Sequence, residues 1–588
     1  MFLTKLKISN FRKLREVELS FQPGLNVLVG SNNVGKTAII DALRALLAGH
    51  DEPYPRFDAE DIHRPKGGVP AGDIEFRYVF SDLSLDDEAD FLAALKLDAK
   101  GKLEAHIAIR YSTGDAVGRL RAKRWCGDHE DVGLTTEMME NLRGVYLPPL
   151  RDASQGLRPG RTSQLSRLLQ LLADEAGREG INEALKKLDL ELKKHAPIVK
   201  THTAIKSRHN TMLGPQLAQA LDLGLSGSDF QRLAARLSLL VDAFEIEQNG
   251  LGFNNLIFMA VVLSELAKNP EASYRSLIVE EPEAHLHPQL QAVLLGYLEA
   301  IKEVEGERPV QLFVTSHSPN FASIADLNSL ACIVDTSGSI ETFFPRAIAF
   351  EKGKREKLQR YLDVTRAELF FANRVIFVEG AAELMLVNVL AEKCDFKLRE
   401  HGVSLISVEG LNFDSFLPLF GEKALKIPVA VITDADPMSE PAGDEEPQAI
   451  YPAPGEKVKV SANTTKTKGY EDTFVKVFHG LKTLEYDLAL HADNRTAMLK
   501  ALKELHPKIG DIVSAAVEAA QGEAAKARAL FSGMFERAQN NVQKGRFSQA
   551  LAQVIVEGDK FVVPDYIREA IAHVCQVKQA APPKQAAQ

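Results

Sequence analysis

The chain has 588 residues, of which 45% are hydrophobic and 26% are charged, as in a soluble globular protein too long for one core. Its net charge of −10 argues against a protein that coats nucleic acid through overall charge, although a local basic patch would permit DNA contact. Four scattered cysteines argue against a disulfide framework or a cysteine-based zinc site. We see neither a signal peptide nor an apolar run of membrane-spanning length, so we expect a cytoplasmic protein with no membrane partner.

The first predicted elements form an α/β unit around a phosphate-binding loop. Residues 2–8 and 17–21 are expected to pair as strands, and residues 25–29 (LNVLV) to form a buried strand before a helix over 36–47. Between them, GSNNVGKT matches G-x-x-x-x-G-K-[ST], in which a lysine reaches the β/γ-phosphate oxygens and a threonine ligates Mg²⁺. The residues expected to hold ATP are Gly30, Asn32, Asn33, Gly35, Lys36 and Thr37.

The pattern becomes helical from residue 162 to about residue 240. Four leucines recur there at helical spacing: Leu165, Leu168, Leu169 and Leu172. The same block holds the most basic stretch of the chain, which we interpret as a solvated helix face in preference to a DNA contact. Its cations are Lys186, Lys187, Lys193, Lys194, Lys200, Lys206 and Arg208.

Two carboxylates end the next apolar strand, SLIVEE. Glu280 is expected to hold Mg²⁺ and Glu281 to act as the general base on the attacking water. The histidines of the following PEAHLHP segment lack a third zinc ligand at suitable spacing, so we assign them to a loop beside the strand. His317, just after the strand LFVT, is placed to sense the γ-phosphate.

NFRKL near the start, the GSNNVGKT loop, EEPEAHLHP and TSHSP together resemble the ATPase head of the ABC class that RecF, SMC and OLD proteins share. This resemblance implies that two heads sandwich ATP and that a signature loop contacts the γ-phosphate of the opposite head. The matching segment is QNGLGFNN, with Asn249 where a serine is usual and Gly250 kept. Glu280 also stands where an aspartate is usual, and no clear Q-loop glutamine is present, which puts rapid dimer-driven turnover in doubt.

A second set of acids follows residue 363. The strand VIFVEG leads into E-G-x-x-E, with Glu379 at the strand end and Glu383 one helical turn later. The strand VITDAD ends in D-x-D, and alternation along an extended strand would put Asp434 and Asp436 on the same side. Four acids at the ends of parallel strands repel one another unless a cation is bound. A hard divalent ion, Mg²⁺ or Mn²⁺, suits such oxygen ligands.

These two patterns, in this order, resemble the Toprim fold of topoisomerases, primases and OLD nucleases. The chain has no room for a topoisomerase DNA-gate domain and lacks the zinc-binding cysteines of primases and RecR-like proteins. The segments TLEYDL and QKGRF instead resemble OLD (overcoming lysogenization defect) nucleases. That resemblance implies that Glu485 completes a second metal site and that Lys544 lies against the scissile phosphate, with Glu379 and Asp434 as catalytic metal ligands.

The resemblance spans nearly the whole chain and implies an α/β protein. We expect an ABC-type, RecF/SMC-like P-loop ATPase over 1–155 and 240–365, interrupted by a helical insertion over 156–239 that mediates dimerisation. A Rossmann-like Toprim nuclease domain would cover 366–575, and residues 576–588 would form a disordered tail. Residues 437–470, rich in Pro, Gly, Ser and charge, are expected to form a long mobile loop.

The function expected from this resemblance is an ATP-binding and ATP-hydrolysing, divalent-metal-dependent DNA endonuclease that acts as a homodimer by two-metal hydrolysis. Its setting would be phage defence or DNA repair, with a UvrD-like helicase as a further partner. One alternative is a RecF/SMC-like ATP-gated DNA-binding repair protein without nuclease activity. Another is a nucleotide-gated toxin or sensor that acts with a partner, as in Gabija-type phage defence.

Overall fold

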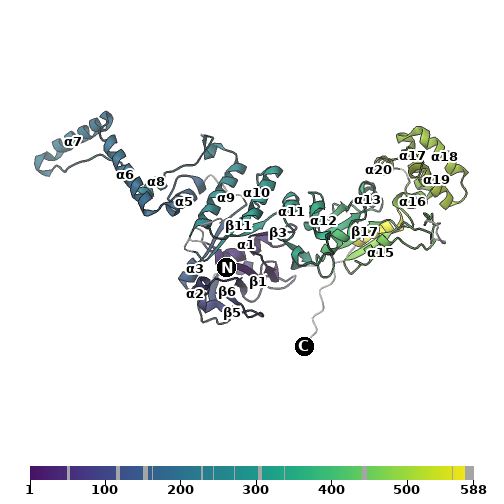
Figure 1. The fold of residues 1–588 in the computed structure, drawn as a ribbon, viewed down its shortest axis with the longest axis horizontal. Helices are drawn as coiled ribbons and strands as arrows, with labels where there is room; N and C mark the ends of the chain where they lie inside the picture. Colours follow the sequence, from purple (N-terminus) through teal and green to yellow (C-terminus); the bar gives the residue numbers. More distant parts are fainter. Residues whose placement is uncertain are drawn as a thin grey trace.

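The computed structural model describes residues 1–48, 53–65, 67–113, 119–149, 156–161, 163–226, 229–242, 244–269, 272–301, 307–336, 338–439, 447–558 and 560–575. The tail expected over 576–588 therefore lies outside the described residues. The described residues form an elongated molecule (Figure 1). A helical arm projects from one end, a two-sheet body lies in the middle, and a four-stranded sheet with its own helices forms the other end.

The first sheet is antiparallel and follows the order β2-β1-β4-β6-β5, with β7 paired to β6. Its strands are β1 (Phe2–Phe11), β2 (Leu14–Ser20), β4 (Ile74–Ser81), β5 (Leu95–Leu97), β6 (Leu103–Thr113) and β7 (Leu120–Cys126). The expected pairing of the first two strands is confirmed, with Leu6 opposite Leu19. Alternate residues of β4 are buried, which is the pattern of a sheet with one face on a core and one toward solvent.

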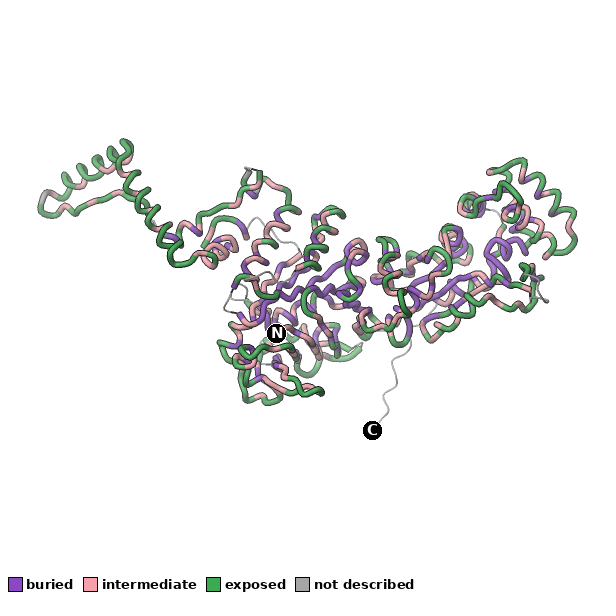
Figure 2. Tube along the Cα trace, in the orientation of Figure 1, coloured by how far each residue is buried: buried purple, intermediate pink, exposed green. Residues whose placement is uncertain are grey.

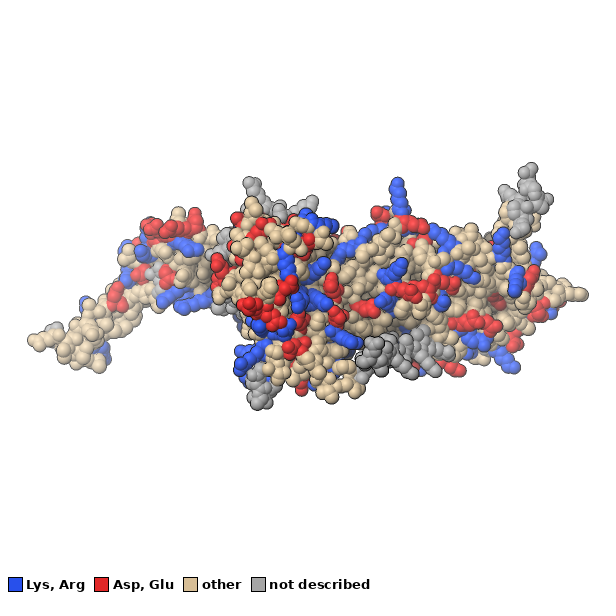
Figure 3. All heavy atoms as spheres, turned by 90° about the horizontal axis from the view of Figure 1, so that it is seen from below, with Lys and Arg blue, Asp and Glu red and all other residues tan. Residues whose placement is uncertain are grey.

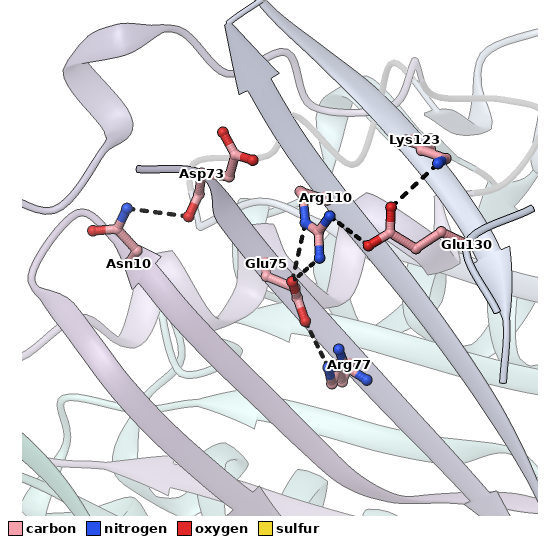
Figure 4. A network of polar contacts seen from close by, with 7 residues as sticks. All are labelled: Asn10, Asp73, Glu75, Arg77, Arg110, Lys123 and Glu130. Carbon is pink, nitrogen blue, oxygen red and sulfur yellow. Dashed lines mark hydrogen bonds and ion pairs between the residues drawn. The ribbon is translucent and has the colours of Figure 1, made fainter. Parts of the chain in front are cut away.

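The outer face of this sheet carries a network of ion pairs (Figure 4). Arg110 on β6 donates to Glu75 at 2.9 Å and to Glu130 at 2.5 Å. Arg77 also pairs with Glu75, and Lys123 with Glu130. Exposed pairs of this kind contribute little stability each, about 0–1 kcal/mol. Their consequence is electrostatic, because the cations of this face are already neutralised by neighbouring acids.

The second sheet forms the centre of the body and follows the order β14-β13-β3-β12-β11-β8. Its strands are β3 (Leu25–Val29), β8 (Leu142–Leu147), β11 (Tyr274–Glu280), β12 (Gln311–Thr315), β13 (Leu330–Thr336) and β14 (Ser339–Phe343). All except β14 run parallel to their neighbours, and β3, β11 and β12 are buried along their whole length. Burial on both faces explains why these segments are nearly continuous apolar runs.

Helices and the first sheet cover the two faces of this central sheet. Leu28 and Ile278 face α1 (Lys36–Leu47) and the antiparallel sheet, whereas Val27 and Val279 face α9 (Leu251–Lys268), α10 (Pro288–Ala300) and α11 (Pro319–Ile324). Short helices lie at the margins of the body: α2 (Leu85–Asp90), α3 (Thr136–Glu140) and α12 (Lys354–Tyr361). The parallel strands therefore lie between α1 and the antiparallel sheet on one face and α9, α10 and α11 on the other.

By length and composition, α9 is apolar enough to cross a membrane, with a mean hydropathy of 1.3 over its 18 residues. In the structure it packs against β11 and against α5 (Gln164–Leu172), and 44% of its residues are buried. This packing explains why α9 is apolar: it is a core helix of the body.

The helical arm consists of α5, α6 (Glu175–Leu192), α7 (Ala196–Leu217) and α8 (Phe230–Ala234), followed by the short strands β9 (Leu240–Val241) and β10 (Phe244–Glu245). Helix α6 buries none of its residues, and Figure 2 shows α6 and α7 as largely exposed. Lys193 of the basic stretch pairs with Asp222 at 2.7 Å, and Lys194 pairs with Glu191. These pairs are what a solvated helix face would show.

The third sheet is parallel throughout and follows the order β16-β15-β17-β18. Its strands are β15 (Arg374–Val378), β16 (Val403–Ser407), β17 (Val429–Thr433) and β18 (Val475–His479). Its helices are α13 (Ala381–Lys393), α14 (Phe413–Phe416), α15 (Ala462–Lys468), α16 (Leu484–Ala489), α17 (Ala492–Leu505), α18 (Pro507–Ala519), α19 (Glu523–Phe535), α20 (Lys544–Val556) and α21 (Asp565–Cys575). Because α15 lies within 437–470, the described part of that segment is not wholly loop.

The second and third sheets share one apolar core. Leu358 of α12, together with Leu369 and Phe370 just before β15, joins the central sheet to Phe377 on β15 in a single cluster of buried residues. Ion pairs bridge the same junction, including Lys426 with Glu341 at 2.6 Å and Lys466 with Glu351 at 3.2 Å. The two α/β units are therefore packed together rather than joined only by a linker.

Candidate active sites

The first candidate site lies where β3 meets α1. Gly30 has a φ of 154°, and a Cβ there would lie 2.3 Å from the carbonyl oxygen of Ile333 on β13. Gly35 caps α1 with a φ of 96°. Both positions require glycine, which explains the loop pattern between them. The backbone of Gly30, Asn32 and Asn33 thus turns sharply at the carboxyl end of the central sheet.

Lys36 is folded back onto this loop. Its Nζ donates to the carbonyl oxygens of Gly30 at 2.6 Å and Ser31 at 2.9 Å. Burial lowers the pKa of Lys36 to about 8, against the opposing attraction of Glu281 and Glu283. The Lys36 ammonium therefore donates to two neutral carbonyl oxygens. Anionic phosphate oxygens would form stronger hydrogen bonds with the same ammonium group.

Glu280, at the end of β11, is held between two hydroxyl groups. One carboxylate oxygen accepts from Thr37 Oγ1 at 3.3 Å and the other from Tyr146 Oη at 2.7 Å. Burial raises the pKa of Glu280, whereas the bond from Tyr146 lowers it. The structure therefore brings the two predicted Mg²⁺ ligands of the nucleotide site, Thr37 and Glu280, into contact.

Glu281 and His317 lie side by side at the same edge, with 3.8 Å between a carboxylate oxygen and Nε2. Glu281 adopts a φ of 46°, which turns the chain away from the strand direction just after Glu280. The two carboxylates of SLIVEE therefore point to different neighbours: Glu280 toward Thr37 and Glu281 toward His317. This separation fits a magnesium ligand and a general base with distinct tasks.

Two residues that the sequence analysis did not single out complete this edge. Glu283 is half-buried, and one of its oxygens accepts from Ser316 Oγ at 2.7 Å and from the His317 amide at 3.0 Å, which fixes the TSHSP loop. Tyr146 is the penultimate residue of β8, the strand next to β11. The EEPE motif contains Glu283, so the sequence offered a way to identify this residue. Nothing in the sequence indicates that β8 pairs with β11, so it offered no way to identify Tyr146.

The signature segment lies apart from this cluster. Asn249 Nδ2 donates to Asn254 Oδ1, and Gly250 caps α9. A Cβ on Gly252 would approach the His285 carbonyl within 2.6 Å, so the segment packs on the loop after β11. Among the described residues, neither Asn249 nor Gly250 forms a hydrogen bond with the phosphate-binding loop of the same chain. The structure does not bring these two residues together with the other predicted ATP ligands.

We expect Tyr146→Phe to impair the use of Mg²⁺ by the nucleotide site. The change removes one hydrogen bond to a carboxylate, about 1.5–3 kcal/mol, and leaves the ring on which Arg44 stacks at 3.9 Å. The Mg²⁺ concentration for half-maximal ATP hydrolysis should rise about tenfold, with a smaller change at saturating Mg²⁺. Tyr297→Phe, at an exposed tyrosine of α10, is the matched control. An unchanged Mg²⁺ titration in Tyr146→Phe would contradict this role.

The second candidate site lies at the carboxyl ends of β15 and β17. Glu379 follows β15 directly, and Gly380 caps α13. Glu383 is the third residue of α13, and its Oε2 accepts from the Gly380 amide at 3.0 Å. Glu379 Oε1 accepts from Thr433 Oγ1 at 2.5 Å and from the Asp434 amide at 2.8 Å, which ties the two strand ends together.

The expected geometry of the D-x-D segment is wrong in one respect. Strand β17 ends at Thr433, and Asp436 has a φ of 40°, so Asp434 and Asp436 lie in a turn and not on one side of an extended strand. The amides of Ala435 and Asp436 both donate to the carbonyl oxygen of Lys482, which holds this turn in place. Two acids spaced by one residue can face a site from a turn as well as from a strand.

Glu485 and Lys544 join the cluster from two helices. Glu485 is the second residue of α16 and is 1% exposed, and its Oε2 pairs with Lys544 Nζ, at the start of α20, at 2.9 Å. Its other oxygen, Oε1, is buried and has no hydrogen-bond partner in the described part of the chain. An unpartnered buried carboxylate oxygen is costly unless something positive approaches it.

Mutual repulsion marks this cluster as one electrostatic unit. Burial and then the charges of Glu379, Glu485 and Glu383 raise the pKa of Asp434 well above its usual range. Burial also raises the pKa of Glu383 and of Asp436. Burial alone would lower the pKa of Lys544, but attraction to Glu485 and Asp434 outweighs it and raises that pKa.

In the described residues, no three carboxylate, histidine or cysteine side chains converge closely enough to enclose a metal ion. Local donors account for this spread: Glu383 turns to the Gly380 amide, Asp434 Oδ1 to the Leu484 amide at 3.1 Å, and Glu485 to Lys544. The donor chemistry nevertheless fits hard divalent cations, because every acid offers oxygen and Glu485 Oε1 lacks a partner.

Comparison with known proteins places two family matches on this chain. Residues 25–323 match an AAA domain described as putative AbiEii toxin, type IV TA system, and residues 370–436 match the Toprim domain of overcoming lysogenization defect protein-like proteins. The chain is 23% identical to the OLD nuclease of Thermus scotoductus over 465 residues, covering 75% of this chain and 84% of that protein. It is 22% identical to endonuclease GajA of Bacillus cereus over 533 residues, covering 74% and 77%. The C-terminal region of the Burkholderia pseudomallei OLD protein matches 35% of this chain and 97% of that structure, at 25% identity and a TM-score of 0.24.

Proposed function

The chain belongs to the OLD family, with an AAA-class ATPase domain followed by an OLD-like Toprim domain, and from this premise we propose that it is an ATPase and a metal-dependent DNA nuclease. The observation that carries the proposal is the second site. Four buried or half-buried acids, the exposed Asp436 and one lysine, drawn from two strand ends and three helices, interact electrostatically with one another.

We propose that ATP binds at the first site through the backbone of Gly30, Asn32, Asn33 and Gly35. Lys36 would exchange its two loop carbonyls for β/γ-phosphate oxygens. Thr37 and Glu280, already in contact, are the pair that would hold Mg²⁺. Glu281 would accept a proton from the attacking water, with His317 beside it oriented by the Glu283 loop.

At the second site we propose hydrolysis of a phosphodiester bond. Two divalent cations, Mg²⁺ or Mn²⁺, would supply Lewis-acid activation of water and neutralisation of phosphate charge. Glu379, Glu383, Asp434, Asp436 and Glu485 are the residues that would hold them. Lys544, paired with Glu485 at 2.9 Å, is positioned to donate to a nonbridging phosphate oxygen and to stabilise the charge that develops there.

The remaining proposals concern organisation. The ATPase would comprise 1–155 and 240–365, the helical insertion 156–239 would mediate homodimer formation, and Toprim would comprise 366–575. Exposed apolar residues on α6 and α7, including Leu190, Ile205 and Met212, support an interface on that arm. Asn249 and Gly250 would contact ATP bound to the opposite head. We place the protein in the cytoplasm, in phage defence or DNA repair; a neighbouring gene for a UvrD-like helicase would favour phage defence.

A plasmid-cleavage assay tests the proposed activity. Supercoiled plasmid is incubated with the purified full chain and Mg²⁺, Mn²⁺ or EDTA, each with and without ATP, and the products are separated on a gel. We expect nicked or linear plasmid with a divalent cation and intact plasmid with EDTA. DNA binding without cleavage under every condition would instead support the alternative of an ATP-gated repair protein of the RecF/SMC type.

A further inference from the structure

Lys482 is attached to the second site through its backbone. It lies between β18 and α16, and its carbonyl oxygen accepts from the amides of Ala435 at 2.8 Å and Asp436 at 3.2 Å. Its own amide donates to Asp487 Oδ1 at 3.3 Å. The position of Lys482 is therefore fixed relative to the D-x-D turn, whatever its side chain does.

The side chain of Lys482 is a buried cation whose nearest contacts are aromatic rings, although its charge also acts on Asp436 and Asp487. The residue is 5% exposed, and its Nζ lies 4.5 Å from the centre of the Tyr451 ring and 5.8 Å from that of Phe531. Among the described residues, no hydrogen bond or ion pair is recorded for this ammonium group. Buried charges normally form direct ion pairs, so a buried cation that lacks one beside a candidate active site is suited to receive an anion.

Charge balance indicates which anion is missing. With two divalent cations bound, the five carboxylates at this site would be ionised, and the cations together with Lys544 would neutralise their five negative charges. A phosphodiester group would then add one further negative charge. Lys482 supplies the matching positive charge: its backbone is hydrogen-bonded to the D-x-D turn, whereas Lys544 pairs with Glu485.

A second cation extends this region toward solvent. The guanidinium of Arg528, an exposed residue of α19, lies 4.6 Å from the centre of the same Tyr451 ring that Lys482 contacts. One buried cation, Lys482, and one exposed cation, Arg528, therefore contact the same Tyr451 ring next to the carboxylate cluster. Cations interleaved with aromatic side chains are typical of surfaces that follow a nucleic-acid backbone.

We propose that the Lys482 ammonium binds a backbone phosphate of the DNA strand that enters the Toprim site. This inference rests on the proposed nuclease function and assigns a substrate contact to a residue outside the metal-binding acids and Lys544. A cation that binds phosphate releases condensed counterions from DNA, so its contribution can be measured through the salt dependence of binding.

The experiment measures binding of a fluorescein-labelled 30-base-pair DNA duplex by anisotropy, with Ca²⁺ in place of Mg²⁺ and at several NaCl concentrations. A denaturing gel verifies that the duplex stays intact. We compare the full-length wild type with Lys482→Met, which keeps an unbranched side chain against Tyr451. The slope of log affinity against log salt should fall by about 0.9 in the variant, or about an eightfold loss at 0.1 M salt relative to 1 M.

Three controls separate the outcomes. Lys508→Met removes the same charge from an exposed position on α18 and should keep the wild-type slope, as should Lys482→Arg, which retains the cation. If Lys482→Met shows no cooperative thermal unfolding and is therefore not folded, Lys482→Gln is used in its place. A wild-type slope in the neutral variants, with normal DNA binding by the wild type, would overturn the phosphate contact alone. Failure of the wild type to bind the duplex would overturn the contact together with the proposed function.

Discussion

Replacing Asp434 with asparagine is expected to abolish divalent-metal-dependent DNA cleavage and to leave ATP hydrolysis unchanged. The substitution removes one charge from the most strongly perturbed acid of the cluster, whose pKa is raised by burial and by Glu379, Glu485 and Glu383. An amide oxygen can still accept from the Leu484 amide, so the turn should keep its shape. Loss of one metal ligand costs several kcal/mol of transition-state stabilisation, and about 4 kcal/mol corresponds to about a thousandfold in rate.

The same variant has an opposite effect on folding, which gives an independent readout. Removing a buried charge from a group of repelling acids should leave the melting temperature in EDTA unchanged or higher than that of the wild type. Addition of Mn²⁺ should raise the melting temperature of the wild type, because a ligand that binds only the folded state stabilises it. That rise should shrink or disappear in Asp434→Asn.

The matched control is Asp493→Asn, an exposed acid in the first turn of α17. It removes the same charge and should retain wild-type cleavage and the wild-type response to Mn²⁺. Normal plasmid cleavage by Asp434→Asn would show that Asp434 is not a metal ligand. A cleavage defect together with an intact Mn²⁺ response would point to a catalytic role for Asp434 other than metal binding.

Much of the fold could be predicted because its central strands are buried on both faces. LNVLV, LFVT and VIFV are short apolar runs followed at once by glycine, hydroxyl or acidic residues, and each is a parallel strand that ends at a site. In such sheets the functional residues follow the carboxyl ends of strands. A predicted strand therefore indicates where to look for a motif, and a motif indicates where the strand before it ends. Local sequence therefore specified Lys36, Glu280, Glu379 and Asp434 together with their surroundings.

What could not be predicted depends on which strands and helices become neighbours. Tyr146 and Glu280 are 134 residues apart and meet only because β8 pairs with β11. Lys482 is distinguished from other lysines by the rings of Tyr451 and Phe531, which come from a loop and from α19. The D-x-D turn was mistaken for strand because alternation holds only while the backbone stays extended, and Asp436 has a positive φ.

The packing between the two α/β units bears on how ATP acts. The cluster of buried residues that contains Val27 and Val29 of β3 also contains Phe377 of β15, so the nucleotide-binding strand and the strand before Glu379 belong to one core. Ion pairs such as Lys426 with Glu341 tie the surface of the junction. Such packing transmits displacement better than a flexible linker, so ATP should influence the second site by moving it as a unit, without taking part in its chemistry.

Lys36→Ala is therefore expected to abolish ATP hydrolysis while preserving metal-dependent DNA cleavage in the absence of ATP. The change removes the ammonium that now donates to the carbonyls of Gly30 and Ser31, and alanine puts no charge in its place. Loss of a cation at the β/γ-phosphates should lower the rate of phosphate release by about 100-fold or more. Any effect of ATP on plasmid cleavage by the wild type should be absent in the variant.

Lys5→Ala, at an exposed lysine of β1, removes the same charge and side chain away from the nucleotide and should hydrolyse ATP normally. Phosphate release and binding of a fluorescent ATP analogue distinguish loss of turnover from loss of affinity. If Lys36→Ala lost DNA cleavage even without ATP, and still melted like the wild type, the second site would depend on the phosphate-binding loop itself. The shared core would then couple the two sites even when no nucleotide is bound, and the idea of an independent nuclease site would have to be abandoned.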